Sequence, residues 1–412
     1  MKIFNKGIGF LFICTGIFSN IVYATDPLTV KQLNGATVNT ITTAVPFLLI
    51  TPDSRAGAMG DAGVASSPDA NSIHWNASKL AFIDKNVGFS VSYTPWLRNL
   101  VPDIYLAYLS GYKKIDKSQV IAASLRYFSL GNIAFTDIVG TPTGNWTPNE
   151  FALDVAYSRK LSENFSGGMS LRYIYSNLTG GIPLENGQTS HAGMAVATDI
   201  SGYYQKELDL SKKKSLLAFG LNISNIGNRI SYTETGNKDF IPINMRLGGS
   251  LKVDLDQYNT ISILADMNKL LVPTPPIYKK DSMGQPVIQD GQPVIAYGRS
   301  GNVGVASGVF GSFNDAPGGY KEELHEINYS FGLEYWYDKQ FAVRTGYFYE
   351  HPTKGDRQYL TFGAGLKYNV FGLDFAYVVP TSSRTSPLQN TLRFTLLFDF
   401  DGFKAENKVE SN

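Results

Sequence analysis

The chain has 412 residues and a formal net charge of +1, with 17% charged and 13% aromatic residues. This length fits two or three soluble domains or one large β-barrel, and the near-neutral charge gives no basic surface for nucleic acid. The mean hydropathy is -0.10. After the N-terminus no apolar run approaches the ~18 residues that a membrane helix needs, so a helical membrane protein is excluded.

Residues 1–24 have the pattern of a secretory signal peptide. A basic start and an apolar stretch lead to Val22-Tyr23-Ala24, which fits a cleavage site, so we expect the mature chain to begin at Thr25. The only cysteine, Cys14, lies within this signal. The mature chain would therefore have no disulfide or thiolate chemistry.

Residues 25–85 show no regular alternation and are rich in Thr, Ala, Gly, Asp and Asn. We interpret them as an N-terminal tail followed by a compact irregular segment with short helices, which would act as a hatch or plug. Gly57, Gly60 and Gly63 recur every three residues, but no strand pattern precedes them as a phosphate-binding loop requires. Close backbone approach inside a narrow lumen is the favoured interpretation.

From residue 86 to residue 401 polar and apolar residues alternate in strand-like segments. In the last segment Leu392, Phe394, Leu396, Phe398 and Phe400 share one face, and the opposite face is polar apart from Leu397. This pattern, behind a signal peptide, predicts a transmembrane antiparallel β-barrel of about fourteen strands, with an apolar side to lipid and a polar lumen. The predicted strand cores are 87–93, 104–113, 119–128, 151–161, 165–175, 192–205, 215–226, 243–254, 259–267, 327–337, 341–349, 359–368, 371–379 and 391–400.

The connections between these segments alternate between short and long. The short ones are 114–118, 162–164, 255–258, 338–340 and 369–370, with a medium one at 206–214. The long ones are 94–103, 129–150, 176–191, 227–242, 268–326, 350–358 and 380–390. Outer-membrane barrels have short periplasmic turns and long outer loops, so we expect an integral outer-membrane protein with both termini periplasmic, including a tail over 402–412. Residues 133–139 look like an extra strand, but an even strand count assigns them to a loop.

Ten charged residues fall on the polar face of the predicted strands. They are Arg126, Asp154, Arg172, Arg246, Lys252, Glu334, Arg344, Lys367, Asp374 and Arg393. A charge that faces lipid at mid-depth costs roughly 2–4 kcal/mol, so these residues fix the phase of their strands. We expect them to pair with one another and with hatch residues such as Asp61 and Asp69. A ligand site in the lumen is the alternative.

Aromatic residues gather near strand ends, as in Tyr203-Tyr204 and Tyr347-Phe348-Tyr349. Amphipathic rings favour the lipid headgroup level, which predicts interfacial girdles. Ordinary strand propensity is the alternative interpretation, since Tyr and Phe are enriched in any sheet.

The connection over 268–326 is the longest in the chain. Two similar stretches, 284–288 and 291–295, predict a small hairpin within it. Loops of this length are usually functional, so we expect this one to contact partner proteins; a plain surface loop is the alternative. The candidate contact residues are Pro273, Pro275, Pro276, Tyr278, Gln285 and Gln292.

No pattern indicates a metal, a cofactor or a catalytic site. The histidines are far apart and lack metal-ligand spacing: His74, His191, His325 and His351. Ser190 beside His191, and Ser72 near His74, leave a lipid or lipopolysaccharide esterase open, but no motif brings nucleophile, base and acid together. We therefore expect a protein without enzymatic activity.

The segment from Ala44 to Ala81 resembles the N-terminal hatch of FadL-type outer-membrane proteins, which are fourteen-stranded barrels. It departs from that pattern at Asn76-Ala77-Ser78, where the superfamily usually has Asn-Pro-Ala. The residues that this resemblance marks as a hatch motif are Arg55, Gly57, Met59, Gly60, Asp61, Asp69, Asn71 and Asn76.

Other segments resemble the PorV family, the outer-membrane shuttle proteins of the type IX secretion system. They are residues 47–57, 93–100, 125–133 and 148–151, and the most specific block is Pro95, Trp96, Leu97, Arg98 and Asn99. The resemblance implies binding of secreted cargo, through the cargo's C-terminal signal domain, at the large translocon barrel. It also implies delivery of the cargo to the surface sortase and attachment complex, beside outer-membrane lipid or lipopolysaccharide.

Three functions stay open from the sequence. A secretion shuttle predicts that partner proteins copurify and that loop changes matter more than lumen changes. A FadL-type transporter of hydrophobic small molecules predicts an apolar pocket that leads from the outer loops past a movable hatch. A lipid-modifying enzyme predicts that changing one His or Ser abolishes activity while the amount of barrel stays the same.

Overall fold

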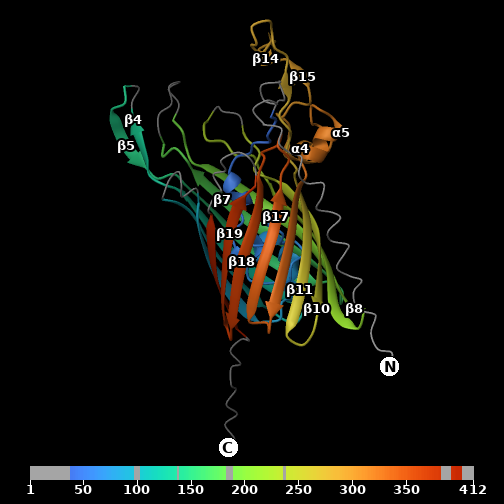
Figure 1. Cartoon of the computed structure of the whole chain (residues 1–412). Helices are drawn as coiled ribbons and strands as arrows, with labels where there is room; N and C mark the ends of the chain where they lie inside the picture. Colours follow the sequence, from blue (N-terminus) through green and yellow to red (C-terminus); the bar gives the residue numbers. More distant parts are fainter. Residues whose placement is uncertain are drawn as a thin grey trace, which may run out of the picture. The chain divides into compact units, whose positions relative to one another are not determined.

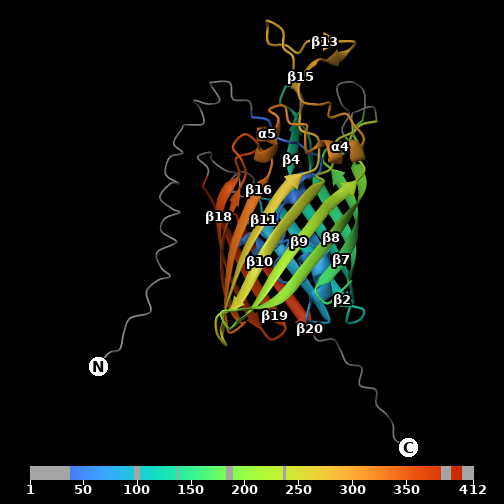
Figure 2. The same cartoon turned by 90° about the vertical axis from the view of Figure 1, so that its right-hand side faces the viewer.

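The computed structural model describes residues 38–96, 103–136, 139–181, 189–234, 238–381 and 391–400. In this part of the chain fourteen antiparallel strands close into one barrel, which confirms the predicted fold class. Figures 1 and 2 show the barrel from two sides, with the long connections gathered at one end and the short turns at the other. The predicted signal peptide and the tail over 402–412 lie outside the described residues.

All fourteen predicted strand cores lie in the barrel wall. In chain order the wall strands are β1 (Val87–Pro95), β2 (Ile104–Lys114), β3 (Gln119–Leu130), β6 (Asn149–Lys160), β7 (Phe165–Asn177), β8 (Gly193–Leu210), β9 (Lys213–Gly227), β10 (Asn244–Asp254), β11 (Asn259–Leu270), β16 (Asn328–Tyr337), β17 (Phe341–Tyr349), β18 (Gln358–Tyr368), β19 (Phe371–Pro380) and β20 (Leu392–Phe400). Each pairs with the next, and β1 pairs with β20, with Val87 opposite Phe400, which closes the sheet.

Two hairpins lie in the long connections without joining the wall. β4 (Ile133–Thr136) pairs with β5 (Pro142–Trp146), so the strand-like pattern at 133–139 that we assigned to a loop is in part a strand outside the barrel. In the longest connection, β13 (Ile288–Gln289) pairs with β14 (Gln292–Pro293), which confirms the predicted small hairpin. β12 (Ile277–Tyr278) and β15 (Ile295–Tyr297) pair at the base of that hairpin. We call residues 277–297 the arm.

The same connection also carries α4 (Val305–Gly311) and α5 (Tyr320–His325). The medium connection predicted at 206–214 is instead a two-residue turn, Ser211 and Lys212, whose φ angles are 51° and 68°. Both angles belong to the tight hairpin turns that match strand twist, so β8 and β9 extend further than predicted. No helix in the described part of the chain is long and apolar enough to span a membrane.

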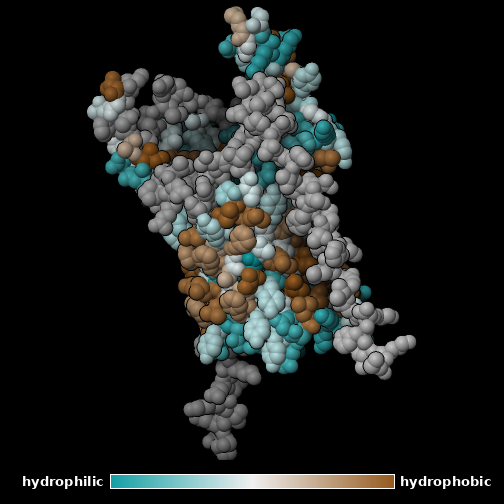
Figure 3. All heavy atoms as spheres, viewed as in Figure 1, coloured by the Kyte–Doolittle hydropathy of each residue, from teal (hydrophilic) through white to brown (hydrophobic). Residues whose placement is uncertain are grey.

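The wall has the alternation that the sequence predicts. On β1, Ser90, Ser92 and Thr94 point into the lumen and are almost fully buried. Val91 and Tyr93 point outward and expose 44% and 48% of their surface. On the face seen in Figure 3, brown apolar residues cover much of the middle of the barrel wall, and more polar residues lie toward its ends. Such an apolar middle is what the hydrocarbon layer of an outer membrane requires.

The predicted aromatic girdles are only partly correct. Successive side chains of a strand point to opposite faces, so neighbouring aromatic residues cannot both face lipid. Tyr203 and Phe348 are buried on the lumen side, while Tyr204, Tyr347 and Tyr349 have the opposite phase. The aromatic runs therefore supply both the outer surface and the interior.

Residues 44–83, which we call the hatch, run through the lumen. They form the short helices η2 (Pro46–Leu49), α2 (Ser54–Gly57), α3 (Ser72–Trp75) and η3 (Ala77–Phe82). Asp53 caps α2, because its carboxylate accepts a hydrogen bond from the Ala56 N–H group at 2.9 Å. The hatch is the blue segment inside the barrel in Figures 1 and 2.

Candidate functional site

A buried ion network ties the hatch to the barrel wall. Arg55 donates to both carboxylate oxygens of Glu334 at 2.9 Å and to Asp69 at 2.9 Å. Glu334, on β16, also accepts from Nε of Arg344 at 2.7 Å, and Arg344 pairs with Asp374 at 2.7 Å. Each of these five buried or half-buried charges thus has at least one partner of opposite sign, which such groups need inside a protein.

A second attachment joins the hatch to β18 and β20. Asp61 accepts a hydrogen bond from the Tyr359 hydroxyl at 2.6 Å and another from Arg393 at 3.3 Å. The Arg393 side chain also covers Gly57 so closely that a Cβ atom there would collide with it. These contacts fix both the end of α2 and the turn that follows it.

The middle of the hatch approaches the wall backbone to backbone. Gly60 has a φ of 65°, and a Cβ atom there would lie 2.6 Å from the Tyr347 backbone nitrogen. Met59 lies in the same way against Gly332 and Gly346, where added side chains would collide with it. Only glycine fits these positions, which agrees with our interpretation of the glycine repeat as close approach in a narrow lumen.

The second half of the hatch is held by neutral hydrogen bonds. Asn71 accepts from the hydroxyls of Ser90 at 2.6 Å and Ser110 at 3.1 Å. The Asn76 amide donates to the Gly202 carbonyl at 3.0 Å. The structure therefore brings all eight hatch-motif residues against the wall or, for Asp69, against an arginine that binds the wall.

Most of the inward charges pair as predicted. Arg172 forms ion pairs with Asp154 and with Asp199, a residue that we did not single out. Three of the inward charges differ: among the described residues Arg246 and Lys252 form no ion pair with a carboxylate, and neither does Arg126. Its guanidinium donates instead to two backbone carbonyls of η2 and contacts Nδ1 of His74 at 2.7 Å. Neutral acceptors can satisfy a buried arginine because its donors are spread around a planar fork.

An apolar layer fills the lumen at the long-loop end. Phe47 is 1% exposed and its ring stacks on Phe128, with centroids 6.3 Å apart. Leu48, Leu106 and Ile174 are buried in the same cluster. A cavity of about 330 Å³ lies beside residues 40–49 at this end. A second cavity, described below, lies at the short-turn end, and the two share no lining residue. The chain's own apolar side chains thus fill this part of the lumen.

A buried ion cluster, which we call the cap network, holds the longest connection onto the barrel. Lys269 of β11 pairs with Glu323 at 3.0 Å and with Glu326 at 2.6 Å. Lys354, from the connection between β17 and β18, pairs with Glu322 at 2.6 Å and with Glu326 at 2.9 Å. The Glu326 side chain is fully buried. Three separate segments therefore meet in one network.

Polar contacts around the cap network fix its neighbours. Asn39 donates to the Pro275 carbonyl at 3.1 Å and to Glu322 at 3.1 Å, so the segment that precedes the hatch is bound to the cap network. Burial alone would raise the pKa of Glu322, but the hydrogen bond from Lys354 brings that pKa below its usual range. Burial raises the pKa of Asp315 to about 6, although its carboxylate accepts from the Thr274 N–H group.

The cap network supports an exposed apolar surface on the long-loop face. Phe310 on α4, Tyr320 on α5 and Met283 on the arm expose 79%, 77% and 82% of their surface. Single exposed apolar side chains are common on protein surfaces, whereas several on one face can form an interaction site. Figure 2 shows the arm projecting beyond the other loops, above α4 and α5.

The predicted contact residues divide between this arm and its base. Tyr278, Gln285 and Gln292 are exposed on the arm, whereas the three prolines are half-buried where the arm leaves the cap. Of the block after β1, Pro95 ends the strand and Trp96 packs against the apolar layer. Leu97, Arg98 and Asn99 lie outside the described residues.

The four histidine rings contact several kinds of partner. His74 contacts Arg126, His191 contacts the Ala192 carbonyl, and His351 contacts the Thr353 hydroxyl. The remaining one, His325, stacks on His351 with ring centroids 3.5 Å apart.

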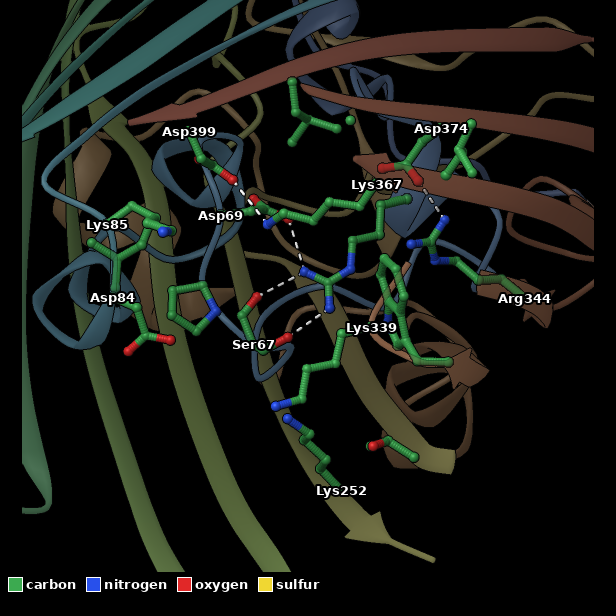
Figure 4. A pocket seen from close by; sticks show the side chains of 18 of the residues that line it. Ser67, Asp69, Asp84, Lys85, Lys252, Lys339, Arg344, Lys367, Asp374 and Asp399 are labelled. Carbon is green, nitrogen blue, oxygen red and sulfur yellow. Dashed lines mark hydrogen bonds and ion pairs between the residues drawn. The ribbon is translucent and has the colours of Figure 1, made fainter. Parts of the chain in front are cut away.

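A cavity of about 390 Å³ opens at the short-turn end of the barrel, between the hatch and the wall. Figure 4 shows its charged lining. Lys367 pairs with Asp399 at 3.1 Å, and Arg344 with Asp374. Lys252 and Lys339 also line this cavity. We call it the basin.

Sequence reasoning missed the cap network. Its charges come from segments up to 85 positions apart in the sequence, as Lys269 and Lys354 are. The only pattern in the sequence that marks this site is the group of acidic residues at 322–326. The pattern of a polar residue in a loop does not distinguish a solvated carboxylate from a buried one. Contacts between loops had to come from the structure.

Residues 33–277 match the family model described as Type IX secretion system protein PorV. The match spans more than half of the chain. The chain belongs to the PorV family. Members of this family are outer-membrane proteins of the type IX secretion system, so this chain is an outer-membrane β-barrel of that system. No curated protein matches it.

Several solved outer-membrane channels are similar to the PorV-family chain at low identity. The Pseudomonas putida toluene transporter TodX is 11% identical, with 88% of this chain and 98% of that chain covered and a TM-score of 0.47. The Ralstonia pickettii toluene transporter TbuX is 12% identical, with 84% and 98% covered and a TM-score of 0.44. A Pseudomonas aeruginosa FadL homologue is 10% identical, with 88% and 100% covered and a TM-score of 0.46.

Proposed function

We propose that the chain is a non-enzymatic shuttle of the type IX secretion system. It binds secreted cargo through the cargo's C-terminal signal domain at the translocon barrel and hands the cargo to the sortase and attachment complex on the cell surface. Membership of the PorV family supports the secretion role. The binding and hand-off steps are our proposal.

The observation that carries this proposal is the contrast between the lumen and the long-loop face. The lumen holds a hatch attached by buried ion pairs, such as the one between Arg55 and Glu334. The long-loop face instead carries exposed aromatic residues, Phe310 and Tyr320, on a cap braced by Lys269 and Lys354. A rigid support with exposed aromatic anchors suits recognition of a protein surface.

The alternative is a FadL-type transporter of hydrophobic small molecules. The cavity of about 330 Å³ at the long-loop end, beside Leu49 and Leu270, favours it. Phe47 and Leu48 fill the apolar layer below that cavity, so transport would require the hatch to withdraw. The shuttle needs no such movement, and we therefore place it first.

The proposal includes a periplasmic C-terminus. Phe400 ends β20 at the short-turn end of the barrel, which is the periplasmic end in outer-membrane barrels. Asn39 lies at the opposite end, where its N–H group bonds to the Thr353 carbonyl at 3.0 Å. We therefore propose a periplasmic position for the C-terminus alone. Residues 1–37 lie outside the described part of the chain.

Changes on the long-loop face test the proposal. Phe310→Ser combined with Tyr320→Ser should leave the barrel intact and raise the fraction of secreted cargo that keeps its C-terminal signal, measured by mass spectrometry of culture medium. Ile115→Ser combined with Val370→Ser is the matched control, because these exposed apolar residues lie in short turns. If both double variants process cargo like the unchanged chain, the long-loop face is not the binding surface.

A further inference from the structure

The basin opens at the short-turn end of the barrel, where a second cavity of about 430 Å³ shares Lys252 with it. The volume of the basin, about 390 Å³, falls within the roughly 300–1,000 Å³ of typical ligand clefts. Hatch residues such as Arg55, Ser67 and Asp69 form one side, and wall residues near the ends of β10, β16, β18, β19 and β20 form the other. Nothing in the shuttle proposal uses this space.

Two lysines of the basin lie outside the ion pairs of the described residues, although Lys252 also lines a second cavity with Glu207, Asp209 and Asp254. The carboxylates of Asp69, Asp374 and Asp399 are already held in ion pairs with Arg55, Arg344 and Lys367. Neither Lys252 nor Lys339 forms an ion pair with any described carboxylate. In Figure 4 both lysine side chains extend toward the same part of the basin, beside Ser67, while Asp84 lies across the cavity from them.

The lysines stand next to a hydroxyl with a free proton. The Ser67 hydroxyl oxygen accepts a hydrogen bond from Arg55 at 2.6 Å, so its own hydrogen remains available to an acceptor in the basin. Lys252 also lines an adjoining recess that contains Ser250 and Ser262. Two ammonium groups and a hydroxyl donor form a set that an anionic oxygen group satisfies.

An apolar wall lies in the same basin. Leu397 is the residue that breaks the alternation of β20, because it places an apolar side chain on the polar face. In the structure Leu397 lines the basin together with Ile83, Pro68 and Trp336. Ile83 and Pro68 belong to the hatch side, and Trp336 to β16. The exception in the sequence pattern thus corresponds to a surface that an apolar side chain could cover.

We propose that the basin binds a peptide segment that ends in, or carries, a carboxylate and is presented from the periplasm. Lys252 and Lys339 hold the carboxylate, with the Ser67 hydroxyl as a third donor. The wall of Leu397 and Trp336 holds a neighbouring apolar side chain of the peptide. This site depends on the barrel and its orientation and not on the proposed binding of cargo by the long-loop face.

The position of the basin favours a peptide over a lipid. Its lining includes Arg55 and Ser67 of the hatch, so the site lies inside the ring of strands. A phospholipid in the inner leaflet has its acyl chains outside that ring and would have to leave the bilayer to reach Lys252. A soluble peptide in the periplasm reaches the same lysine through the open mouth of the barrel.

Binding of a defined peptide pair to the full chain in detergent tests the proposal. The probes are fluorescein-labelled Gly-Ser-Gly-Leu with a free terminal carboxylate and the same peptide with a terminal amide. We expect the free acid to bind about tenfold more tightly, as a charge-assisted bond predicts. Lys252→Gln combined with Lys339→Gln should remove that preference. Leu397→Ser should weaken the binding of both peptides alike.

Matched lysines at the same end of the barrel provide the control. Lys117→Gln combined with Lys212→Gln changes two exposed turn lysines outside the basin, and the preference for the acid should persist. Heat-dependent mobility on gels checks that each variant is folded. Equal binding of acid and amide, or equal loss in both double variants, would overturn the proposal. So would tight binding of dihexanoyl phosphatidylglycerol without peptide binding, which would assign the basin to lipid.

The result can be separated from that of the shuttle proposal. The Phe310→Ser and Tyr320→Ser variant keeps both basin lysines, so it should bind the acid peptide normally. If cargo processing fails in that variant while peptide binding is normal, the two sites act independently. If the basin variant alone loses peptide binding, the basin proposal holds even where the shuttle proposal fails.

Discussion

Glu334 is the residue whose loss should free the hatch from the wall. Its two oxygens accept two hydrogen bonds from Arg55 at 2.9 Å and one from Arg344 at 2.7 Å. Removing one partner of a buried ion pair costs about 3–5 kcal/mol. Because Arg55 keeps Asp69 and Arg344 keeps Asp374, we expect Glu334→Ala to cost about 3 kcal/mol, at the lower end of that range.

Hydrogen exchange of hatch amides measures this cost directly. The N–H groups of Gly57 and Ala58 bond to the carbonyls of Asp53 and Ser54, so they exchange only when this part of the hatch opens. A loss of about 3 kcal/mol speeds their exchange about hundredfold. Glu334→Gln should act in the same direction, because it keeps the shape but turns an amide donor toward a guanidinium.

The control for this measurement is Glu163→Gln. Glu163 is exposed in a short turn, and such surface changes usually shift stability by less than about 0.5 kcal/mol. If exchange in α2 is the same in Glu334→Ala, in Glu163→Gln and in the unchanged chain, the ion network does not hold the hatch. The attachment would then rest on the glycine contacts.

Three further predictions follow from the same structure. Gly346→Ala should destabilise the hatch by roughly 1–3 kcal/mol, seen as faster α2 exchange, because its Cβ would collide with the Met59 backbone. Met283→Cys should make the chain react with a membrane-impermeant maleimide in intact cells, and Lys117→Cys should not. The opposite result would show that the barrel has the reverse orientation in the membrane. Burial lowers the pKa of His325. Burial and repulsion from His325 together lower the pKa of His351 to about 4. When the loops of the cap network separate, these histidines regain the ordinary histidine pKa of about 6.5 and bind more protons below that pH. The stability of the cap network should therefore fall from pH 6.5 toward 4, and protease should then cleave at α5. His351→Phe should weaken that dependence and leave only the part that His325 contributes; a dependence as steep as in the unchanged chain would refute the role of His351.

The wall was predictable because a barrel repeats one simple rule. Alternation along β1 or β20 assigns each residue to lipid or lumen, and the long and short connections set the order of the strands. The turn at Ser211 and Lys212 was missed because neither residue is the glycine or asparagine that usually marks such turns. The β4 segment was misassigned because the count of wall strands says nothing about hairpins outside the wall.

The contacts between hatch and wall were predictable in kind but not in detail. The inward phase of Arg344 and Glu334 followed from the strand pattern, and pairing followed from the cost of buried charge. Which hatch residue meets Glu334 did not follow, since Arg55 lies 279 positions away. Arg126 was predicted to find an acid and instead donates to backbone carbonyls of η2. The cap network around Glu326 had no signal in the sequence beyond an acidic run.

The most direct test of the shuttle role is deletion of the gene, followed by mass spectrometry of periplasmic and secreted fractions, with rescue by the intact chain. We predict that proteins with type IX C-terminal signals accumulate uncleaved in the periplasm, or appear outside with the signal still attached, and that rescue restores trimming. Unchanged export and trimming, together with reduced uptake of a hydrophobic compound such as toluene, would contradict the shuttle and favour the transporter.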